Sequence, residues 1–226
     1  MKLKSKFFSG IVKVLGPIVR FLYRIKIHGL ENEPPVENGP YVLICNHISN
    51  ADPVFLCAGG TKQQPHFMAK KELFKIPLLK NLLAALGAYP VDRKGADVST
   101  IKKTIQMIKD GKCVGIFPQG HREKGIHPKD ANLKQGAAMI AVKAQATILP
   151  CCVKTKKMKF SFFRRVDVYF GKPIPFEELG YDPEASGEYM RITKLAFDRV
   201  CQLYDAAVAE EEAKKEAKKE GKNRGK

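Results

Sequence analysis

Apolar residues along the chain fall into two patterns that alternate. Short continuous apolar runs, which are typical of buried strands, occur at residues 42–45, 113–117, 147–152 and 166–170. Residues 97–109 instead place Val98, Ile101, Ile105 and Ile108 at the spacing of an amphipathic helix, and residues 137–146 form a second helical stretch. Strands that alternate with helices are typical of an α/β fold. We therefore expect a mainly parallel central sheet flanked by helices.

The length of the chain favours one domain. Its 226 residues are enough for one well-buried core, and somewhat short for two once the ends are set aside. We assign residues 29–206 to this domain, residues 1–28 to an amphipathic N-terminal segment, and residues 207–226 to a charged tail. The tail is almost entirely Glu, Lys, Ala and Gly. Glu-to-Lys pairs four residues apart favour a helix at its start, but without an apolar face the tail is expected to fray and be disordered.

The N-terminal segment combines an apolar face with a basic border. Apolar pairs recur at helical spacing and no acidic residue precedes Glu31, while the basic residues are Lys2, Lys4, Lys6, Lys13, Arg20, Arg24 and Lys26. Because Lys13 and Arg20 interrupt the apolar positions, neither a signal peptide nor a membrane-spanning helix is expected. The pattern favours a helix lying in an anionic membrane surface, at the cytoplasmic face of the cell membrane in a peripheral or monotopic protein. The alternative is a helix packed on the protein's own core.

The rest of the chain is also basic, with a formal net charge of +17. Lysines and arginines surround three phenylalanines between residues 154 and 165, a mixture that suits phospholipid headgroups, an acidic acyl carrier protein or RNA. No aromatic RNA-reading motif accompanies this charge, so no nucleic-acid partner is expected. The six cysteines lie mostly in apolar runs without metal-ligand spacing, which predicts buried thiols in a reducing compartment, without a metal site.

A histidine and an aspartate stand five positions apart, at His47 and Asp52, directly after the first strand-like run. Histidine ordinarily titrates near pH 6.5 and can take a proton from a hydroxyl group, and a carboxylate on its second ring nitrogen fixes its tautomer. On one regular helix the two side chains would point roughly 140° apart, so they converge only across a turn. Asp52 and Pro53 favour a helix start there. The alternative is that Asp52 only caps this helix while His47 bonds to a local backbone group.

Residues 46–52 resemble the Asn-His-x4-Asp block of the glycerolipid acyltransferases, the 1-acylglycerol-3-phosphate acyltransferase family. Four further segments resemble later blocks of that family in the same order: 87–93, 116–122, 133–138 with 148–150, and 168–174. Together the five segments span roughly residues 40 to 180. The chain departs from the family pattern at Gln119, where glutamate is usual, and at His121, where threonine is usual.

This resemblance implies an enzyme that moves a fatty acyl group from an acyl thioester to the sn-2 hydroxyl of lysophosphatidic acid and so forms phosphatidic acid. His47 would be the general base and Asp52 its partner. The thioester, on coenzyme A or acyl carrier protein, would be a co-substrate, and no cofactor or metal would be needed. A membrane phospholipid surface and lysophosphatidic acid would be the other partners.

The resemblance also implies a substrate-binding set. Lys70, Arg93 and Arg122 would provide cationic donors for the phosphate, with Gln119 and Gly120 in the same block as Arg122.

Two alternatives stay open at this point. The blocks indicate the reaction more securely than the acceptor, so the chain could acylate another lysolipid or an amino-acid-linked lipid. It could also be a basic membrane-binding or RNA-binding module without catalytic activity, a function class that the net charge and Gln119 favour.

Overall fold

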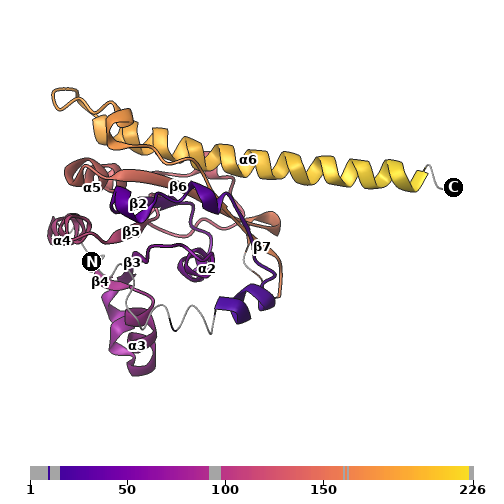
Figure 1. Cartoon of the computed structure of the whole chain (residues 1–226), viewed down its shortest axis with the longest axis horizontal. Coiled ribbons are helices and arrows are strands. Elements are labelled where there is room, and N and C mark those ends of the chain that lie inside the picture. The colour runs from indigo at the N-terminus through magenta and orange to yellow at the C-terminus, as the bar shows by residue number, and fades with distance from the viewer. Residues whose placement is uncertain (1–9, 11–15, 92–97, 160, 162, 224–226) are drawn as a thin grey trace.

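The computed structural model describes residues 10, 16–91, 98–159, 161 and 163–223. These residues form one α/β domain around a seven-stranded sheet in the order β1-β7-β6-β2-β5-β3-β4 (Figure 1). The strands are β1 (Lys26–His28), β2 (Tyr41–Cys45), β3 (Pro65–Lys70), β4 (Tyr89–Val91), β5 (Cys113–Ile116), β6 (Thr147–Thr155) and β7 (Val166–Phe170). Neighbouring strands are parallel except for β6 and β7, which are antiparallel. The expectation of a mainly parallel sheet in a single domain is confirmed.

Helices cover both faces of this sheet. They are α2 (Asp52–Ala58), α3 (Pro77–Ala85), α4 (Val98–Lys109), α5 (Gly136–Ala144) and α6 (Glu188–Asn223). Alternate side chains of the fully buried strand β2 enter two separate cores, because successive residues of a strand point to opposite faces. Val42 and Ile44 pack with α4, α5 and α6, whereas Leu43 and Cys45 pack with α2. The helices α5 and α6 therefore lie on one side of the sheet and α2 on the other (Figure 1).

The structure adds three strands that the apolar pattern does not predict, namely β1, β3 and β4. Strand β1 lies inside the predicted N-terminal segment 1–28 and pairs with β7 at the edge of the sheet, so residues 26–28 belong to the domain. Residues 16–22 are helical, while residues 1–9 and 11–15 of the predicted membrane segment lie outside the described residues. In the described part of the chain, no helix combines the length and the apolar character needed to cross a bilayer.

The C-terminal tail differs from its predicted disorder. Helix α6 starts against the core, where Ile192, Ala196 and Val200 are fully buried, and runs on without a break to Asn223. Beyond the domain it extends as a projecting rod (Figure 1). Ala, Glu and Lys have high helix propensity, and Glu210 and Lys214 form an ion pair one turn apart. Helix propensity and ion pairing therefore stabilise this part of α6, which has no apolar face to pack on the domain.

Candidate active site

The register of the sheet brings the histidine loop and the third motif block together. Strands β2 and β5 are parallel neighbours, with Ile44 opposite Ile116. His47 and Gln119 each lie three residues after this pair, at the same end of the two strands. The backbone N–H of His47 donates a hydrogen bond to Oε1 of Gln119 at 2.5 Å. Ligand sites of open α/β sheets lie beyond the carboxyl ends of strands, and this contact is at that edge.

On the other side of β2, Asn46 fixes the loop to β6. Its Oδ1 accepts from the backbone N–H of Val153 and its Nδ2 donates to the carbonyl of the same residue, both at 2.9 Å. The buried amide of Asn46 thus extends the strand ladder by one step. His47 is the next residue, and its backbone is therefore held against both neighbouring strands.

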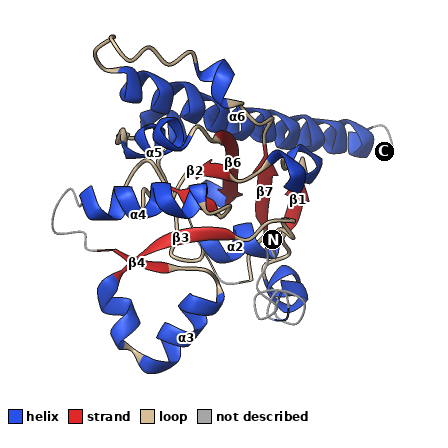
Figure 2. Cartoon of the chain, turned by 60° about the vertical axis from the view of Figure 1, so that its left-hand side comes forward, coloured by secondary structure: helices blue, strands red, loops and turns tan. Residues whose placement is uncertain are grey.

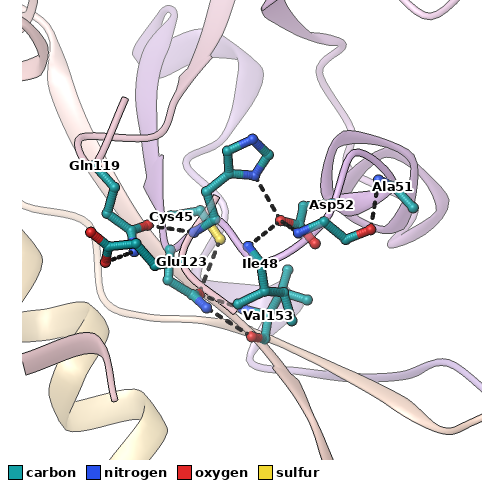
Figure 3. Close-up of polar contacts among 10 residues, drawn as sticks. Cys45, Ile48, Ala51, Asp52, Gln119, Glu123 and Val153 are labelled. Atoms are coloured by element: carbon teal, nitrogen blue, oxygen red, sulfur yellow. Dashed lines mark hydrogen bonds and ion pairs between the residues drawn. The ribbon is translucent and has the colours of Figure 1, made fainter. Parts of the chain in front are cut away.

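His47 and Asp52 face each other across the turn between β2 and α2. The ring Nδ1 of His47 lies 2.8 Å from Oδ2 of Asp52. The same oxygen accepts from the backbone N–H groups of Ile48 at 2.7 Å and Ser49 at 2.8 Å (Figure 3). Asp52 is fully buried, and these three donors stabilise its charge.

Asp52 does not act as a helix cap. The first residue of α2 is Asp52 itself, the cap position is Ala51, and no side chain caps the helix. The carboxylate points back to the loop and to His47 instead of forward to the first free N–H groups of α2. The alternative in which Asp52 only caps the helix is therefore wrong, although Pro53 does lie in the first turn as predicted.

The contact with Asp52 sets the tautomer of His47. A carboxylate only accepts hydrogen bonds, so Nδ1 carries a proton, and in the neutral form of the imidazole Nε2 is the nitrogen with the free lone pair. The imidazole ring stacks on Phe117 with 4.1 Å between ring centroids and 16° between planes. Phe117 in turn stacks on Phe67 at 5.8 Å. Asp52 and Phe117 thus fix the orientation of the His47 ring, while 12% of the surface of this side chain stays exposed.

Glu123 completes the surroundings of His47. Its backbone N–H donates to the carbonyl of His47 at 2.8 Å. Its buried carboxylate accepts from Nε2 of Gln119 at 2.7 Å and lies 3.3 Å from the exposed ring of His121. Figure 3 places Gln119 and Glu123 on one side of the loop and Asp52 on the other.

The remaining predicted substrate-binding residues do not form one cluster with His47. Gly120 has a φ of 71°, and a Cβ atom there would lie 3.1 Å from the side chain of Lys134. Arg122 is exposed, as is Lys70 at the end of β3, and within the described residues neither forms an ion pair or a hydrogen bond with His47. Arg93 lies outside the described residues.

The cysteines are buried apolar residues, as predicted. Five are buried, Cys201 is partly exposed, and all six are free thiols. Burial raises the pKa of Cys45 well above its ordinary value, and it raises the pKa of Cys113 to about 12. Neither thiol is therefore a thiolate near neutral pH. In the part of the chain that the structure describes, no three His, Cys, Asp or Glu side chains are arranged to hold a metal ion.

Comparison with known proteins shows the family to which the chain belongs. The family model described as Acyltransferase matches residues 24–154, and the chain therefore belongs to the acyltransferase family. This stretch covers β1 to β5 and all but the last residue of β6, and it includes both His47 and Gln119.

Individual relatives carry more specific names. The chain is 32% identical over 180 residues to the 1-acyl-sn-glycerol-3-phosphate acyltransferase of Bacillus subtilis, which covers 79% of this chain and 86% of that protein. It is 34% identical over 148 residues to the protein of the same name from Streptococcus pneumoniae, covering 64% of this chain and 54% of that one. The fold resembles that of the 1-acyl-sn-glycerophosphate (LPA) acyltransferase PlsC from Thermotoga maritima, with a TM-score of 0.67 and 23% identity over 89% of this chain and 80% of that chain.

Sequence reasoning misses two side chains at this site. The sequence places Phe117 only at the end of a strand and does not single out Glu123, yet the first stacks on His47 and the second bonds to its backbone and to Gln119. Both lie about 70 residues from His47 along the chain. Phe117 belongs to the motif segment 116–122, but only the pairing of β2 with β5 reveals that either residue contacts His47.

Proposed function

We propose that this protein transfers a fatty acyl group from an acyl thioester to the sn-2 hydroxyl of lysophosphatidic acid and so forms phosphatidic acid. Membership of the acyltransferase family and the names of the relatives from Bacillus and Streptococcus support this reaction. The observation that carries the proposal is the 2.8 Å contact between His47 and Asp52, which leaves Nε2 of His47 as the basic nitrogen.

In the proposed mechanism, Nε2 of His47 takes the proton of the acceptor hydroxyl as its oxygen attacks the thioester carbonyl. A carbon–oxygen bond forms, the carbon–sulfur bond breaks, and the departing sulfur takes the proton from the imidazolium. The carboxylate of Asp52 stabilises that imidazolium while it exists. Positioned general-base catalysis contributes about 10²–10⁴-fold in rate, and a thioester is activated enough that no acyl-enzyme is needed.

For the phosphate of the acceptor we propose Lys70, Arg93 and Arg122 as cationic donors. Arg122 is exposed and has no ion-pair partner among the described residues, and the positive φ of Gly120 shapes the backbone two residues before it. A guanidinium fork suits a phosphate, whereas Lys70 would act as a mobile point charge.

The direct test supplies lysophosphatidic acid to the purified protein with acyl-coenzyme A or acyl carrier protein as donor, and follows phosphatidic acid by mass spectrometry. Other lysolipids are added in competition. The His47→Ala variant is expected to lose turnover at unchanged folding. His127→Ala is the matched control, because His127 also pairs with an aspartate, at 2.9 Å, but this partner is Asp205 of helix α6. Near-normal turnover of His47→Ala would remove His47 from the mechanism.

We further propose that the protein works at the cytoplasmic face of the membrane as a peripheral or monotopic protein. Phe21 in the helix of residues 16–22 is 83% exposed, and Leu78 in α3 is 86% exposed. Both helices lie on the side of the sheet away from α6 (Figure 1), and in Figure 2 α3 extends beyond β4. Helix α3 has apolar residues at most of its positions but no described residue that is buried, and Lys75 and Lys80 accompany it. Exposed apolar side chains bordered by lysines suit an anionic lipid surface.

Vesicle sedimentation tests the membrane binding that this location requires. Binding to vesicles of phosphatidylcholine with phosphatidylglycerol is expected to exceed binding to phosphatidylcholine alone. Phe21→Ser and Leu78→Ser are expected to weaken it, whereas Val98→Ser, at a residue of α4 that is 61% exposed, serves as the control. Equal sedimentation of all variants would contradict a role for these two helices in membrane binding.

A further inference from the structure

One loop holds both backbone polar groups of His47. The N–H of His47 donates to Oε1 of Gln119 at 2.5 Å, and the carbonyl of His47 accepts from the N–H of Glu123 at 2.8 Å. Nε2 of Gln119 donates to Oε2 of Glu123 at 2.7 Å, so the three hydrogen bonds form a closed circuit that links His47, Gln119 and Glu123 (Figure 3). Gln119 is 2% exposed and Glu123 is 6% exposed, so water screens this circuit weakly.

The circuit has a single consistent arrangement of donors and acceptors. The N–H of His47 needs an acceptor, and the carboxylate of Glu123 needs a donor. A glutamine at position 119 provides both, one from each end of its amide group. A glutamate there would satisfy His47 but would turn its second oxygen toward the carboxylate of Glu123. The residue that departs from the family pattern at position 119 is thus matched by a carboxylate four residues later.

We propose that Glu123 is a positioning residue that orients the Gln119 amide toward the backbone of His47, and that positions 119 and 123 form a coupled pair in which only one carboxylate is tolerated. The pair holds the loop from which the imidazole of His47 projects. The kinetic part of this proposal rests on the proposed function, whereas the coupling itself concerns folding and is measurable without substrate.

A reciprocal exchange of the two side chains tests the coupling. In Q119E two carboxylates face each other at a buried position, and kcat is expected to fall at least about 10-fold with KM changed less, a size within the range of coupled neighbours. In E123Q the new amide oxygen at position 123 still accepts from Gln119, so the loss is expected to be only about 2- to 3-fold. In Q119E/E123Q the donor and the acceptor have exchanged places, and activity is expected to return to within about 3-fold of the natural chain.

A matched control comes from helix α4. Gln106 donates to Asp110 at 2.9 Å in the same spacing of four residues, but on the exposed surface. Q106E therefore creates a similar pair of carboxylates in water, where both stay charged and hydrated at little cost. It is expected to leave kcat and the unfolding temperature almost unchanged.

The unfolding temperature gives a readout that does not depend on turnover. Two carboxylates in contact share a proton, so Q119E has a carboxyl pKa raised above its unfolded value of about 4.3. Such a group destabilises the fold at neutral pH, and its deficit relative to the natural chain shrinks as pH falls toward about 5. Charged or titratable groups that contact the pair or lie next to it include His47, His121, Arg122 and Lys124, with Lys134 beside Gly120, so the comparison is repeated with H121Q in the natural chain and in Q119E.

The four chains separate the possible outcomes. Rescue of Q119E by E123Q in both kcat and unfolding temperature supports the proposal. A Q119E variant within about 2-fold of the natural chain, or a double variant no better than Q119E, would overturn it. If the natural chain has no activity on lysophosphatidic acid, the proposed function fails, and the unfolding temperatures of the four chains still decide whether the two positions are coupled.

Discussion

Replacing Asp52 by asparagine removes one charge and leaves the shape of this side chain almost intact. The asparagine oxygen can take the place of Oδ2 and still accept from His47 and from the backbone N–H groups of Ile48 and Ser49. The amide nitrogen then takes the place of Oδ1, which is buried and has no hydrogen-bond partner among the described residues. The Nδ1–H tautomer of His47 is kept, and what is lost is the negative charge beside the imidazolium that forms during the reaction.

The structure sets bounds on the size of this loss. Turning a charge-assisted hydrogen bond into a neutral one costs about 1–1.5 kcal/mol, which lowers kcat about 10-fold. The Coulomb energy for unit charges roughly 4 Å apart at an effective dielectric constant of about 20 is about 4 kcal/mol, which corresponds to roughly 10³-fold. Because Asp52 is fully buried and the side chain of His47 is 12% exposed, we expect a fall in kcat between these limits.

Stability is expected to fall as well, for a separate reason. The asparagine amide places one unpaired donor in a buried position, a cost of about 1–3 kcal/mol, and each kcal/mol lowers the melting temperature of a domain of this size by about 2–4 °C. The assay is steady-state acyl transfer to lysophosphatidic acid, with circular dichroism melting of the same samples. A variant with kcat within about 2-fold of the natural chain and a lower melting temperature would refute the catalytic reasoning and leave Asp52 as a structural residue.

Three further predictions concern the surroundings of the site. Phe117→Leu removes the ring stacked on His47. It is expected to lower kcat about 2- to 10-fold, since an aromatic pair contributes roughly 0.5–1.5 kcal/mol. An unchanged kcat would contradict a role for the stack. Gly115→Ala places a Cβ atom in direct overlap with the ring of Phe67 and is expected to destabilise the fold by about 1–3 kcal/mol, seen as a lower urea midpoint. An unchanged midpoint would show that the ring moves aside freely. The folded protein is expected to react slowly with Ellman's reagent at about pH 8, because burial raises the thiol pKa values, as in Cys113. The urea-unfolded protein is expected to react at all six cysteines. Rapid labelling of one thiol in the folded protein, with loss of activity, would contradict this.

The sequence predicts those parts of the fold that depend on long apolar runs. The strands β2, β5, β6 and β7 lie where such runs occur, and α4 begins within one residue of its predicted start. The strands β1 and β4 escape prediction because each has three residues, and β4 contains Pro90 at its centre. These strands are short and lie at the edges of the sheet, where neighbouring strands and not local propensity decide the conformation.

The residues of the candidate site also fall into two groups, those that the sequence predicts and those that it does not. His47 and Asp52 are five residues apart, so their convergence needs only the local turn that Pro53 favours, and spacing alone indicates it. For residues on other strands, the sequence does not predict how they lie relative to His47. The family resemblance assigns Lys70 and Arg122 to substrate binding, and the structure leaves both exposed and without a hydrogen bond to His47 among the described residues. A motif fixes which residues are present, but the direction of a long, exposed cation is set by the ligand it meets.

Position 119 shows why a departure from a motif needs the structure to be understood. From the sequence, the loss of a carboxylate at Gln119 favours a protein without catalytic activity. The geometry weakens that inference, because the group that meets position 119 is a backbone N–H, from which a glutamine oxygen and a glutamate oxygen can both accept, the neutral one more weakly. The two side chains differ further in what they present to the neighbour on the far side, and here that neighbour is Glu123, whose carboxylate requires a donor. The substitution at one position therefore has meaning only together with the residue four positions later, and a residue-by-residue comparison with the motif misses that relation.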